Sequence, residues 1–402
     1  MNRTETYEEI KPLIDLCKAG KLFEVQEWIA SGKPVNGPQP VSGYRRKDPL
    51  EVAINLGFHS LVQVLLEGGA DIKESRYNPL QHALWNKRLD LIELLVGHGA
   101  DCHSVEMEEV FDTWQPDIMR WFIEHGADVE TGNPLAQALC NRIRTSLGIF
   151  RAYKDRYPSF QEQANIALRY HCREGNLKWV SLTLWAGADP YAKGPDSWPE
   201  NPDPENDQSA LELAAGYENF DVFKLKKIRL DPANSNLTGI LLEACRAKNS
   251  NFLEKLLKKG FNPGEYKNNG TPLIQALLTS MSWYFGYKHW DIWSTDQTSK
   301  RDMDNEESRE KIKMIHMLAK HGAKWFPKDR SEIGETRRSL LKMKPDYTVE
   351  FIWIMSKFNA SKREDVEELI RTPSMRSLIL QFADRVNELL QKFHLKNSAL
   401  SN

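Results

Sequence analysis

Apolar and polar positions along this chain recur in units of about thirty residues. In the clearest unit, an apolar segment at 50–54 is followed by a second at 61–66, and the unit closes on a polar turn at 68–71. The next unit, residues 78–101, repeats the same order. Apolar residues spaced three and four positions apart are typical of helices, so each unit is expected to form a pair of short helices.

The clear units close on the same short phrase, Gly-Ala-Asp, with the glycine at 69, 99, 126 or 187. The intervals between these glycines are 30, 27 and 61 residues, and the last interval equals two periods of about 30. A fixed period of this size indicates stacked repeats, in which each unit buries its apolar face against its neighbours. The sequence therefore predicts an all-α solenoid.

The residues at the ends of the predicted helices fit this architecture. Proline suits the first helical position, where its missing N–H costs no hydrogen bond, and a preceding Asp, Asn or Thr can cap the helix. Glycine suits the position just after a helix, where the backbone turns left-handed. The predicted cap-proline pairs are Asp48-Pro49, Asn78-Pro79, Asn133-Pro134 and Thr271-Pro272, and the predicted left-handed glycines are at 69, 99, 126, 187, 260 and 322.

These turns and helices together resemble the ankyrin repeat, whose pattern has a Thr-Pro-Leu-His-x-Ala turn into one helix and a Leu-Leu-x-x-Gly-Ala exit from the next. Residues 78–83 are similar to that turn, and residues 65–70 are similar to that exit. The resemblance implies an ankyrin-repeat solenoid of about nine units over residues 1–326. Residues 327–402 keep helical spacing without the repeat signature, which favours a C-terminal helical cap over a separate partner-binding module.

The composition is that of a chain without a secretory leader or a membrane span. The 402 residues include 54 basic and 56 acidic side chains, and 41% are hydrophobic. No apolar run approaches the roughly 18 residues that a membrane span requires. The five cysteines are scattered, which favours packing in a reducing compartment over a disulfide framework. We therefore expect a cytoplasmic protein.

The sequence offers few groups for catalysis. No phosphate-binding glycine loop, His-Glu-x-x-His or Cys-x-x-Cys spacing occurs, so we expect no enzyme, no cofactor and no metal site. The neighbouring Cys/His pairs are Cys102-His103 and His171-Cys172. Adjacent residues on a helix point in different directions, which makes His171-Cys172 a poor start to a metal site.

In proteins that resemble ankyrin repeats, partners usually dock on the concave face, which is built from the turns and the exposed side of each first helix. Alignment of each unit to the family pattern places a variable pair of residues there, just before the mid-repeat glycine. Trp85 is the most informative of these residues, because a tryptophan in water is costly and needs a reason. The partner-binding residues predicted on this face are Asn55, Trp85, Asn86, Asp112, Asn141, Arg173, Glu174, Tyr217 and Arg246.

Two segments interrupt the repeats, and loops on a rigid scaffold often carry binding residues. The first, at about 195–207, holds four prolines and five acids around Trp198, which predicts a stiff, extended acidic loop. The second, at about 280–309, begins with an aromatic cluster and ends in a charged run. Such a cluster is typical of an interface hot spot, and packing of the rings onto the ninth unit is the alternative. The partner-binding residues predicted in it are Trp283, Tyr284, Tyr287, Trp290 and Trp293.

Charge alternates in blocks along the chain. Attraction between facing blocks would explain this pattern, and so would a surface that selects and orients one partner. The predicted function is a noncatalytic adaptor or inhibitor that recognises a dedicated protein partner, such as an effector, nuclease or toxin. No membrane and no small-molecule substrate are expected. The blocks are residues 67–138 with 14 acidic and 5 basic side chains, 139–180 with 3 and 8, 195–221 with 8 and none, and 224–259 with 3 and 9.

A nucleic-acid-binding protein is the alternative function. A stripe of basic and aromatic residues at 142–179 could hold phosphates and stack bases. The acidic blocks on both sides of the stripe would repel a long duplex, so a protein partner is favoured. The stripe consists of Arg142, Arg144, Arg151, Lys154, Arg156, Arg169, Arg173 and Lys178 with Tyr153, Tyr157, Tyr170 and Trp179.

Overall fold

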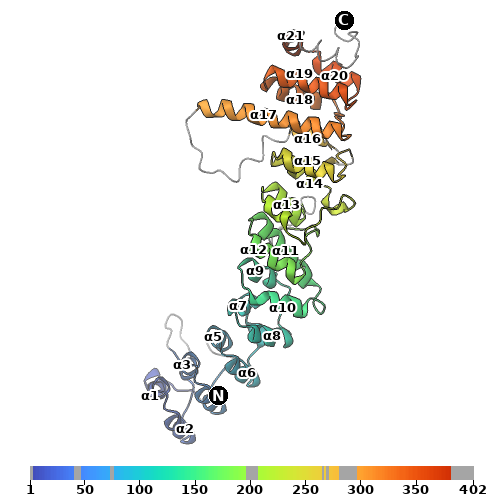
Figure 1. Cartoon of the computed structure of the whole chain (residues 1–402). Coiled ribbons are helices and arrows are strands. Elements are labelled where there is room, and N and C mark those ends of the chain that lie inside the picture. The colour runs from blue at the N-terminus through green and yellow to red at the C-terminus, as the bar shows by residue number, and fades with distance from the viewer. Residues whose placement is uncertain are drawn as a thin grey trace. The chain divides into compact units, whose positions relative to one another are not determined.

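A computed structural model describes most of the chain as helices in two compact units (Figure 1). The boundary between the units falls within α11 (Ser159–Arg173) and α12 (Leu177–Ala186). The N-terminal unit holds the described residues up to Leu168 together with Ser181–Asp189, and the other described residues form the C-terminal unit. The described residues are 3–39, 47–72, 77–195, 207–264, 267–268, 271–279 and 297–381.

The N-terminal unit is a stack of helix pairs. First helices pack on first helices, as α1 does on α3, and second helices pack on second helices, as α2 does on α4. A short 3-10 turn, η1 (Cys102–Ser104), separates the third pair from the fourth. The pairs are α1 (Tyr7–Lys18) with α2 (Leu22–Ala30), α3 (Pro49–Leu56) with α4 (His59–Glu67), α5 (Pro79–Trp85) with α6 (Leu89–Gly97), α7 (Met107–Asp112) with α8 (Pro116–Glu124), and α9 (Pro134–Cys140) with α10 (Thr145–Tyr153).

The C-terminal unit repeats this alternation. One row runs through α14, α16, α18 and α20, and the other runs through α15, α17, α19 and α21. The elements are α13 (Ala210–Gly216) with η3 (Phe220–Lys224), η4 (Ser235–Leu237), α14 (Ile240–Arg246) with α15 (Ser250–Lys258), α16 (Leu273–Thr279) with α17 (Gln297–Lys320), α18 (Arg330–Lys342) with α19 (Pro345–Lys357), α20 (Arg363–Ile370) with α21 (Pro373–Gln381), and the two-residue strands β1 (Lys267–Asn268) and β2 (Thr271–Pro272), which pair antiparallel. The prediction of an all-α solenoid is confirmed.

The six predicted exit glycines all adopt left-handed backbone conformations, with φ between 84° at Gly126 and 118° at Gly187. At these exits the alanine that follows closes the turn, as when the Ala70 N–H donates to the Leu65 carbonyl at 2.9 Å. This hydrogen bond satisfies a carbonyl that has no partner inside the helix. Glycine is favoured here because a Cβ atom makes the left-handed conformation costly.

The same turn recurs after α19, where no Gly-Ala phrase occurs in the sequence. Asn359 takes the left-handed position with a φ of 48°, and the Ala360 N–H donates to the Met355 carbonyl at 2.9 Å. The pair α18 and α19 therefore closes like a repeat and packs on α16 and α17. The function of residues 327–402 as a cap stays a prediction.

The cap predictions are confirmed at two of the four helix starts. Asp48 accepts a hydrogen bond from the Glu51 N–H at 2.7 Å, and Asn78 accepts one from the Leu80 N–H at 3.0 Å. The prediction for Asn133 is wrong, because that residue turns left-handed at a φ of 53° and its side chain makes no cap. Pro272 lies in β2, and the helix begins one residue later.

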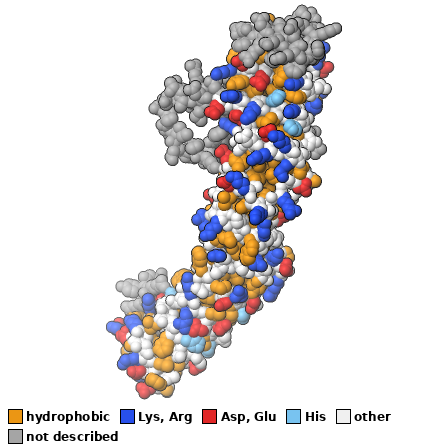
Figure 2. Space-filling view, viewed as in Figure 1, with side chains coloured by type: hydrophobic (Ala, Val, Ile, Leu, Met, Phe, Trp, Pro, Cys, Tyr) orange, Lys and Arg blue, Asp and Glu red, His pale blue; other side chains and the backbone are white. Residues whose placement is uncertain are grey.

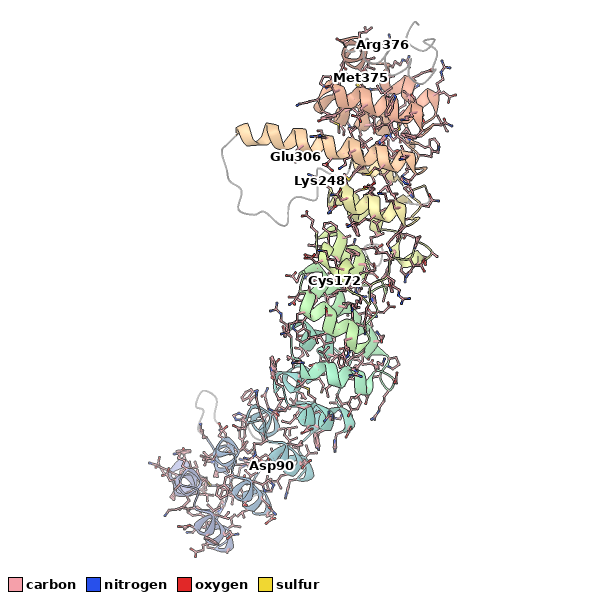
Figure 3. All side chains as sticks on the ribbon, viewed as in Figure 1. Asp90, Cys172, Lys248, Glu306, Met375 and Arg376 are labelled. Atoms are coloured by element: carbon pink, nitrogen blue, oxygen red, sulfur yellow. The ribbon has the colours of Figure 1, made fainter. Side chains whose placement is uncertain are left out.

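The core of each unit is formed by the apolar sides of the helix pairs. Leu65 and Leu95 of the N-terminal unit and Leu256 of the C-terminal unit have no exposed surface. The cysteines are free thiols, and Cys17, Cys140, Cys172 and Cys245 are buried; Figure 3 labels Cys172 among the packed helices. Burial raises the pKa of the Cys17 thiol to about 12, which keeps it protonated. Among the described residues, every helix is too short or too polar to cross a membrane.

Part of the second predicted insertion is helical. The segment 297–309 forms the start of α17, so the charged run extends the second helix of the ninth pair. Residues 280–296, which include the predicted aromatic cluster, lie outside the described residues.

Two glycine substitutions separate backbone conformation from packing. Gly99 has a φ of 95°, Gly148 lies inside α10, and a Cβ atom added at either would meet nothing within 4 Å. Gly99→Ala is expected to lower the free energy of unfolding by about 1–2 kcal/mol, the cost of a left-handed L-residue. Gly148→Ala is expected to raise it by about 0.5–1 kcal/mol, because alanine loses less entropy in a helix. Urea denaturation of both variants measures the two effects, and equal effects would contradict the role of the exit turn.

Candidate functional site

Each predicted variable pair ends a first helix, immediately before a residue in the left-handed conformation. In the second unit Asn55 and Leu56 precede Gly57, and in the third Trp85 and Asn86 precede Lys87. The alignment made from the sequence therefore holds for all seven pairs, including those in units that match the family pattern poorly. The left-handed residues are Gly57, Lys87, Trp114, Arg142, Gly175, Glu218 and Lys248, with φ values from 51° to 69°.

The predicted residues of the N-terminal unit are all exposed. Asn55, Trp85, Asp112 and Asn141 stand at or next to the ends of α3, α5, α7 and α9, and Asn86 follows Trp85. Trp85 is 59% exposed, as predicted for a tryptophan that the fold does not need. The structure therefore places these five side chains at equivalent points of successive repeats.

The predicted residues of the C-terminal unit are more deeply involved in local contacts. Glu174 is exposed, whereas Arg173, Tyr217 and Arg246 are half-buried. Arg173 donates from Nε to Glu174 at 3.3 Å, and its guanidinium lies 5.3 Å from the centre of the Tyr170 ring. Arg246 donates to the buried carboxylate of Glu243 at 2.6 Å. These contacts fix the side chains and reduce the surface that they offer.

The predicted residues of the two insertions cannot be placed in the same way. Trp198 in the first insertion, and Trp283, Tyr284, Tyr287, Trp290 and Trp293 in the second, lie outside the described residues.

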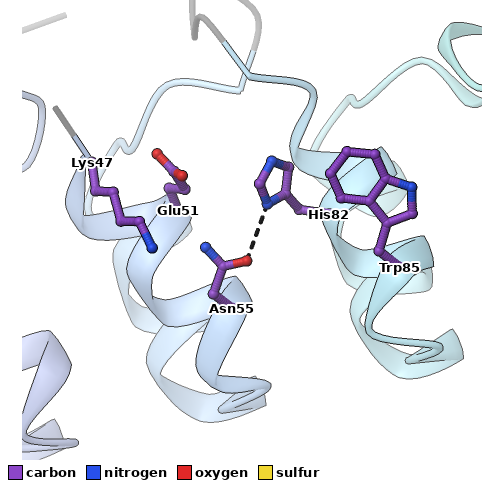
Figure 4. Close-up of a pocket in the computed structure, with 5 residues that line it drawn as sticks. All are labelled: Lys47, Glu51, Asn55, His82 and Trp85. Atoms are coloured by element: carbon purple, nitrogen blue, oxygen red, sulfur yellow. Dashed lines mark hydrogen bonds between the residues drawn. The ribbon is translucent and has the colours of Figure 1, made fainter. Parts of the chain in front are cut away.

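An open pocket of about 480 Å³ lies between α3 and α5 in the N-terminal unit (Figure 4). Two of its five lining residues, Asn55 and Trp85, were predicted from the sequence as binding residues. Glu51 and Asn55 are four residues apart on α3, and His82 and Trp85 are three apart on α5, so each pair shares one face of its helix. The lining residues are Lys47, Glu51, Asn55, His82 and Trp85.

Polar contacts hold the two walls of this pocket together. His82 Nδ1 lies 3.1 Å from Asn55 Oδ1, and because a carboxamide oxygen only accepts, the imidazole donates from Nδ1. Asn86 donates from Nδ2 to the Ile54 carbonyl at 3.2 Å, which ties the end of α5 to α3. The His82 ring centre lies 5.1 Å from that of Trp85. His82 is buried, so the indole rests on a fixed support while its outer surface stays exposed.

A buried acidic group lies at the start of the same helix. Burial raises the pKa of the Asp48 carboxyl to about 6, against the hydrogen bonds from the Glu51 backbone and from the Tyr77 hydroxyl at 3.2 Å, which lower it. Burial and the nearby Asp48 charge in turn hold the pKa of Tyr77 well above its usual value. The Tyr77 hydroxyl therefore stays protonated and acts as a donor to Asp48.

Two further apolar side chains are exposed near the ends of first helices. Leu56, the last residue of α3, is 53% exposed, and Trp114, just after α7, is 49% exposed. Sequence reasoning did not select Trp114, because it occupies the left-handed position where the family pattern has glycine. Leu56, Trp85 and Trp114 thus mark three successive repeats on the side that the variable pairs define.

The basic and aromatic stripe proposed for nucleic acid is partly buried. Arg169 has no exposed surface and donates from Nε to the Pro195 carbonyl at 2.6 Å and from Nη1 to the Ala192 carbonyl at 3.1 Å. Tyr153 and Trp179 are also buried. For these three residues the prediction of a surface stripe is wrong, because they support the fold. Figure 2 shows the Lys and Arg side chains of the visible face interspersed with acidic and hydrophobic ones.

Metal-ligating side chains gather at a different place in the N-terminal unit. Among the described residues, Asp101, Cys102 and His103 form the one group of three such residues whose donor atoms all lie within 4.8 Å of one another. The group lies in η1 and its cap, between α6 and α7.

Comparison with known proteins agrees with the repeat architecture. Residues 13–106 match the family model of ankyrin repeats in three copies. The solenoid of helix pairs defines a repeat protein, and the Gly-Ala exits with this match identify the family. The chain is an ankyrin-repeat protein. Ankyrin repeats generally mediate protein–protein interactions, typically without catalysis.

The similar proteins share only part of their length with this chain. The ankyrin repeat and KH domain-containing protein mask-1 of Caenorhabditis elegans is 24% identical over 277 residues, which are 64% of this chain and 10% of that protein. The mouse B-cell lymphoma 3 protein homolog is 40% identical over 68 residues, 16% of this chain and 15% of that protein. The human ASB11 ankyrin repeat domain is 17% identical with a TM-score of 0.35, covering 58% of this chain and 97% of that domain.

The pKa of Asp48 predicts a change of stability with pH. Because its folded pKa of about 6 lies above the ordinary 3.8, the folded state binds the proton more tightly, and this contribution is lost as pH rises from about 4 to about 6. Asp48→Asn keeps a capping oxygen but removes the titration. The wild type is expected to lose up to about 3 kcal/mol relative to this variant over that range. Urea denaturation at several pH values measures the difference, and a difference that does not change with pH would contradict the burial of the carboxyl.

Proposed function

We propose that this chain is a noncatalytic module that binds a dedicated protein partner on the first-helix face of its N-terminal unit. The pocket between α3 and α5 would be the centre of the contact, with Trp85 as its anchor. The observation that carries the proposal is the 59% exposure of Trp85 on a wall fixed by the His82–Asn55 hydrogen bond. Tryptophan is among the residues that contribute most to protein–protein binding when a partner covers it.

The construction of the pocket favours a protein partner. Its walls are helices, and the Asn86 contact with the Ile54 carbonyl joins their ends. A wall that is already ordered loses little conformational entropy when a partner binds, so more of the contact energy remains as affinity. Leu56 and Trp114 extend the apolar surface to the neighbouring repeats.

The differences among repeats favour one partner over many. The left-handed position carries Gly57 in one unit, Lys87 in the next and Trp114 in the third, so each repeat presents a different side chain. A face of this kind recognises a particular surface, since specificity comes from side chains that fit one partner and not another. We infer that the protein acts as an adaptor or inhibitor of that partner, and that the two meet in the cytoplasm.

Substitution of two tryptophans tests the proposed face. Trp85→Ala is expected to weaken binding to a partner captured and identified from native lysate by at least about 2 kcal/mol, the cost of losing a central aromatic anchor. Trp185→Ala is the matched control, because Trp185 is 55% exposed but lies on the second helix α12, where it stacks with Arg151. Isothermal titration calorimetry measures both dissociation constants.

A third variant separates binding from folding. Leu65 is fully buried, so Leu65→Ala is expected to lower the free energy of unfolding by about 2–5 kcal/mol, whereas Trp85→Ala leaves it nearly unchanged. Equal losses of affinity in the two tryptophan variants, or a loss in Trp185→Ala alone, would place the contact on another surface and reject the proposed face.

A further inference from the structure

Three consecutive side chains converge at the exit of the third repeat. His103 Nδ1 lies 3.1 Å from Asp101 Oδ1 and 3.5 Å from Cys102 Sγ. The residues are brought together by η1, a 3-10 turn that Asp101 caps by accepting a hydrogen bond from the His103 N–H at 2.9 Å. Asp101 and His103 are exposed, and Cys102 is half-buried.

The second nitrogen of His103 determines what the first can do. His103 Nε2 lies 3.1 Å from the Gly126 carbonyl oxygen, at the exit of the next repeat. Because a carbonyl oxygen only accepts, Nε2 carries the hydrogen, and the neutral imidazole has its lone pair on Nδ1. That lone pair faces the carboxylate oxygen of Asp101, which also only accepts. Two acceptors at this distance repel each other unless a cation lies between them.

We propose that Asp101, Cys102 and His103 form a binding site for a divalent transition-metal ion such as Zn²⁺. Tetrahedral zinc has bonds of about 2.0–2.1 Å to nitrogen, about 2.0–2.2 Å to oxygen and about 2.3 Å to sulfur, which separate neighbouring ligand atoms by about 3.2–3.6 Å. The separations of His103 Nδ1 from the other two donor atoms, 3.1 and 3.5 Å, are close to this range. The contact with Gly126 supplies the outer hydrogen bond that orients a metal-binding histidine.

The donor atoms select the kind of metal. A thiolate, an imidazole and a carboxylate together favour Zn²⁺ or Co²⁺, whereas Mg²⁺ and Ca²⁺ prefer oxygen ligands alone. Backbone and side-chain hydrogen bonds from His103 hold the pKa of Asp101 below its usual value, so its carboxylate is charged at neutral pH. The three ligands leave a coordination position for water or for a ligand from a partner.

Other repeats show that aspartate alone does not make this site. Asp128 occupies the same place at the next exit and accepts hydrogen bonds from the Glu130 and Thr131 N–H groups at 2.9 and 3.1 Å. Of the four Gly-Ala-Asp exits, only that of Asp101 is followed by Cys and His. The aspartate is therefore a turn residue in every exit, and the metal ligands are an addition in one.

Cobalt spectroscopy on the full-length, reduced protein tests the proposal. Of the five cysteines Cys102 alone is not buried, so a thiolate-to-cobalt charge-transfer band reports on this site. We expect the band in the wild type, its loss in Cys102→Ser, and at least a ten-fold weaker Co²⁺ affinity in His103→Ala, since loss of a ligand exceeds the roughly 10–100-fold effect of losing an outer contact. Zn²⁺ should displace Co²⁺ and raise the melting temperature, whereas Mg²⁺ should do neither.

Asp128→Asn is the matched control, and it should keep the band and the affinity of the wild type. Circular dichroism verifies that each variant is folded. No band in the wild type would overturn the proposal, and so would a band that survives Cys102→Ser or an affinity unchanged in His103→Ala. In that case a proton rather than a metal bridges His103 and Asp101, and NMR would show a doubly protonated His103 ring at neutral pH.

Discussion

The left-handed turn is the constraint on which this structure depends. A first helix can reverse into a second only if the residue between them leaves the right-handed conformation, and the exit from the second helix needs the same. Lys87 makes the first of these turns in the third repeat, and Gly99 makes the second. Because each repeat spends one residue on each turn, corresponding helices come into register and pack in two rows. The buried leucines can then fill the space between rows with their apolar sides.

The same constraint fixes where a partner can bind. The two residues before the mid-repeat turn cannot be buried between the rows, so their side chains are available to vary. Trp85 and Asn55 stand at this point in adjacent repeats, and the pocket forms because His82 and Asn86 join their helices. The exit turns offer a second set of variable positions, where Asp101 is followed by Cys102 and His103. Binding positions are thus a consequence of the turns rather than a separate feature of the fold.

The sequence predicts the parts of this structure that have few physical solutions. Glycine at an exit, as at Gly69, has one evident reason, and so the period and the helix pairs could be found. Left-handed residues with side chains, such as Trp114 and Asn359, give no such signal, because packing elsewhere offsets their conformational cost. Burial was equally hidden for Arg169, whose charge suggested the surface but whose guanidinium holds two backbone carbonyls. The Cys102 cluster was missed because its ligands are adjacent in sequence, a spacing that fails on an α-helix but succeeds in a 3-10 turn.

Site-specific photo-crosslinking tests the central claim, that the ends of the first helices form the binding face, most directly. A photoreactive amino acid would replace Asn55, Asp112 or Asn141 on that face, and Gln63 on the second helix α4 as a control, each of which is exposed. With the partner present, irradiation should link it to the chain at positions 55 and 112, less at 141, and not at 63. Efficient crosslinking at 63 with none at 55 and 112 would contradict the account.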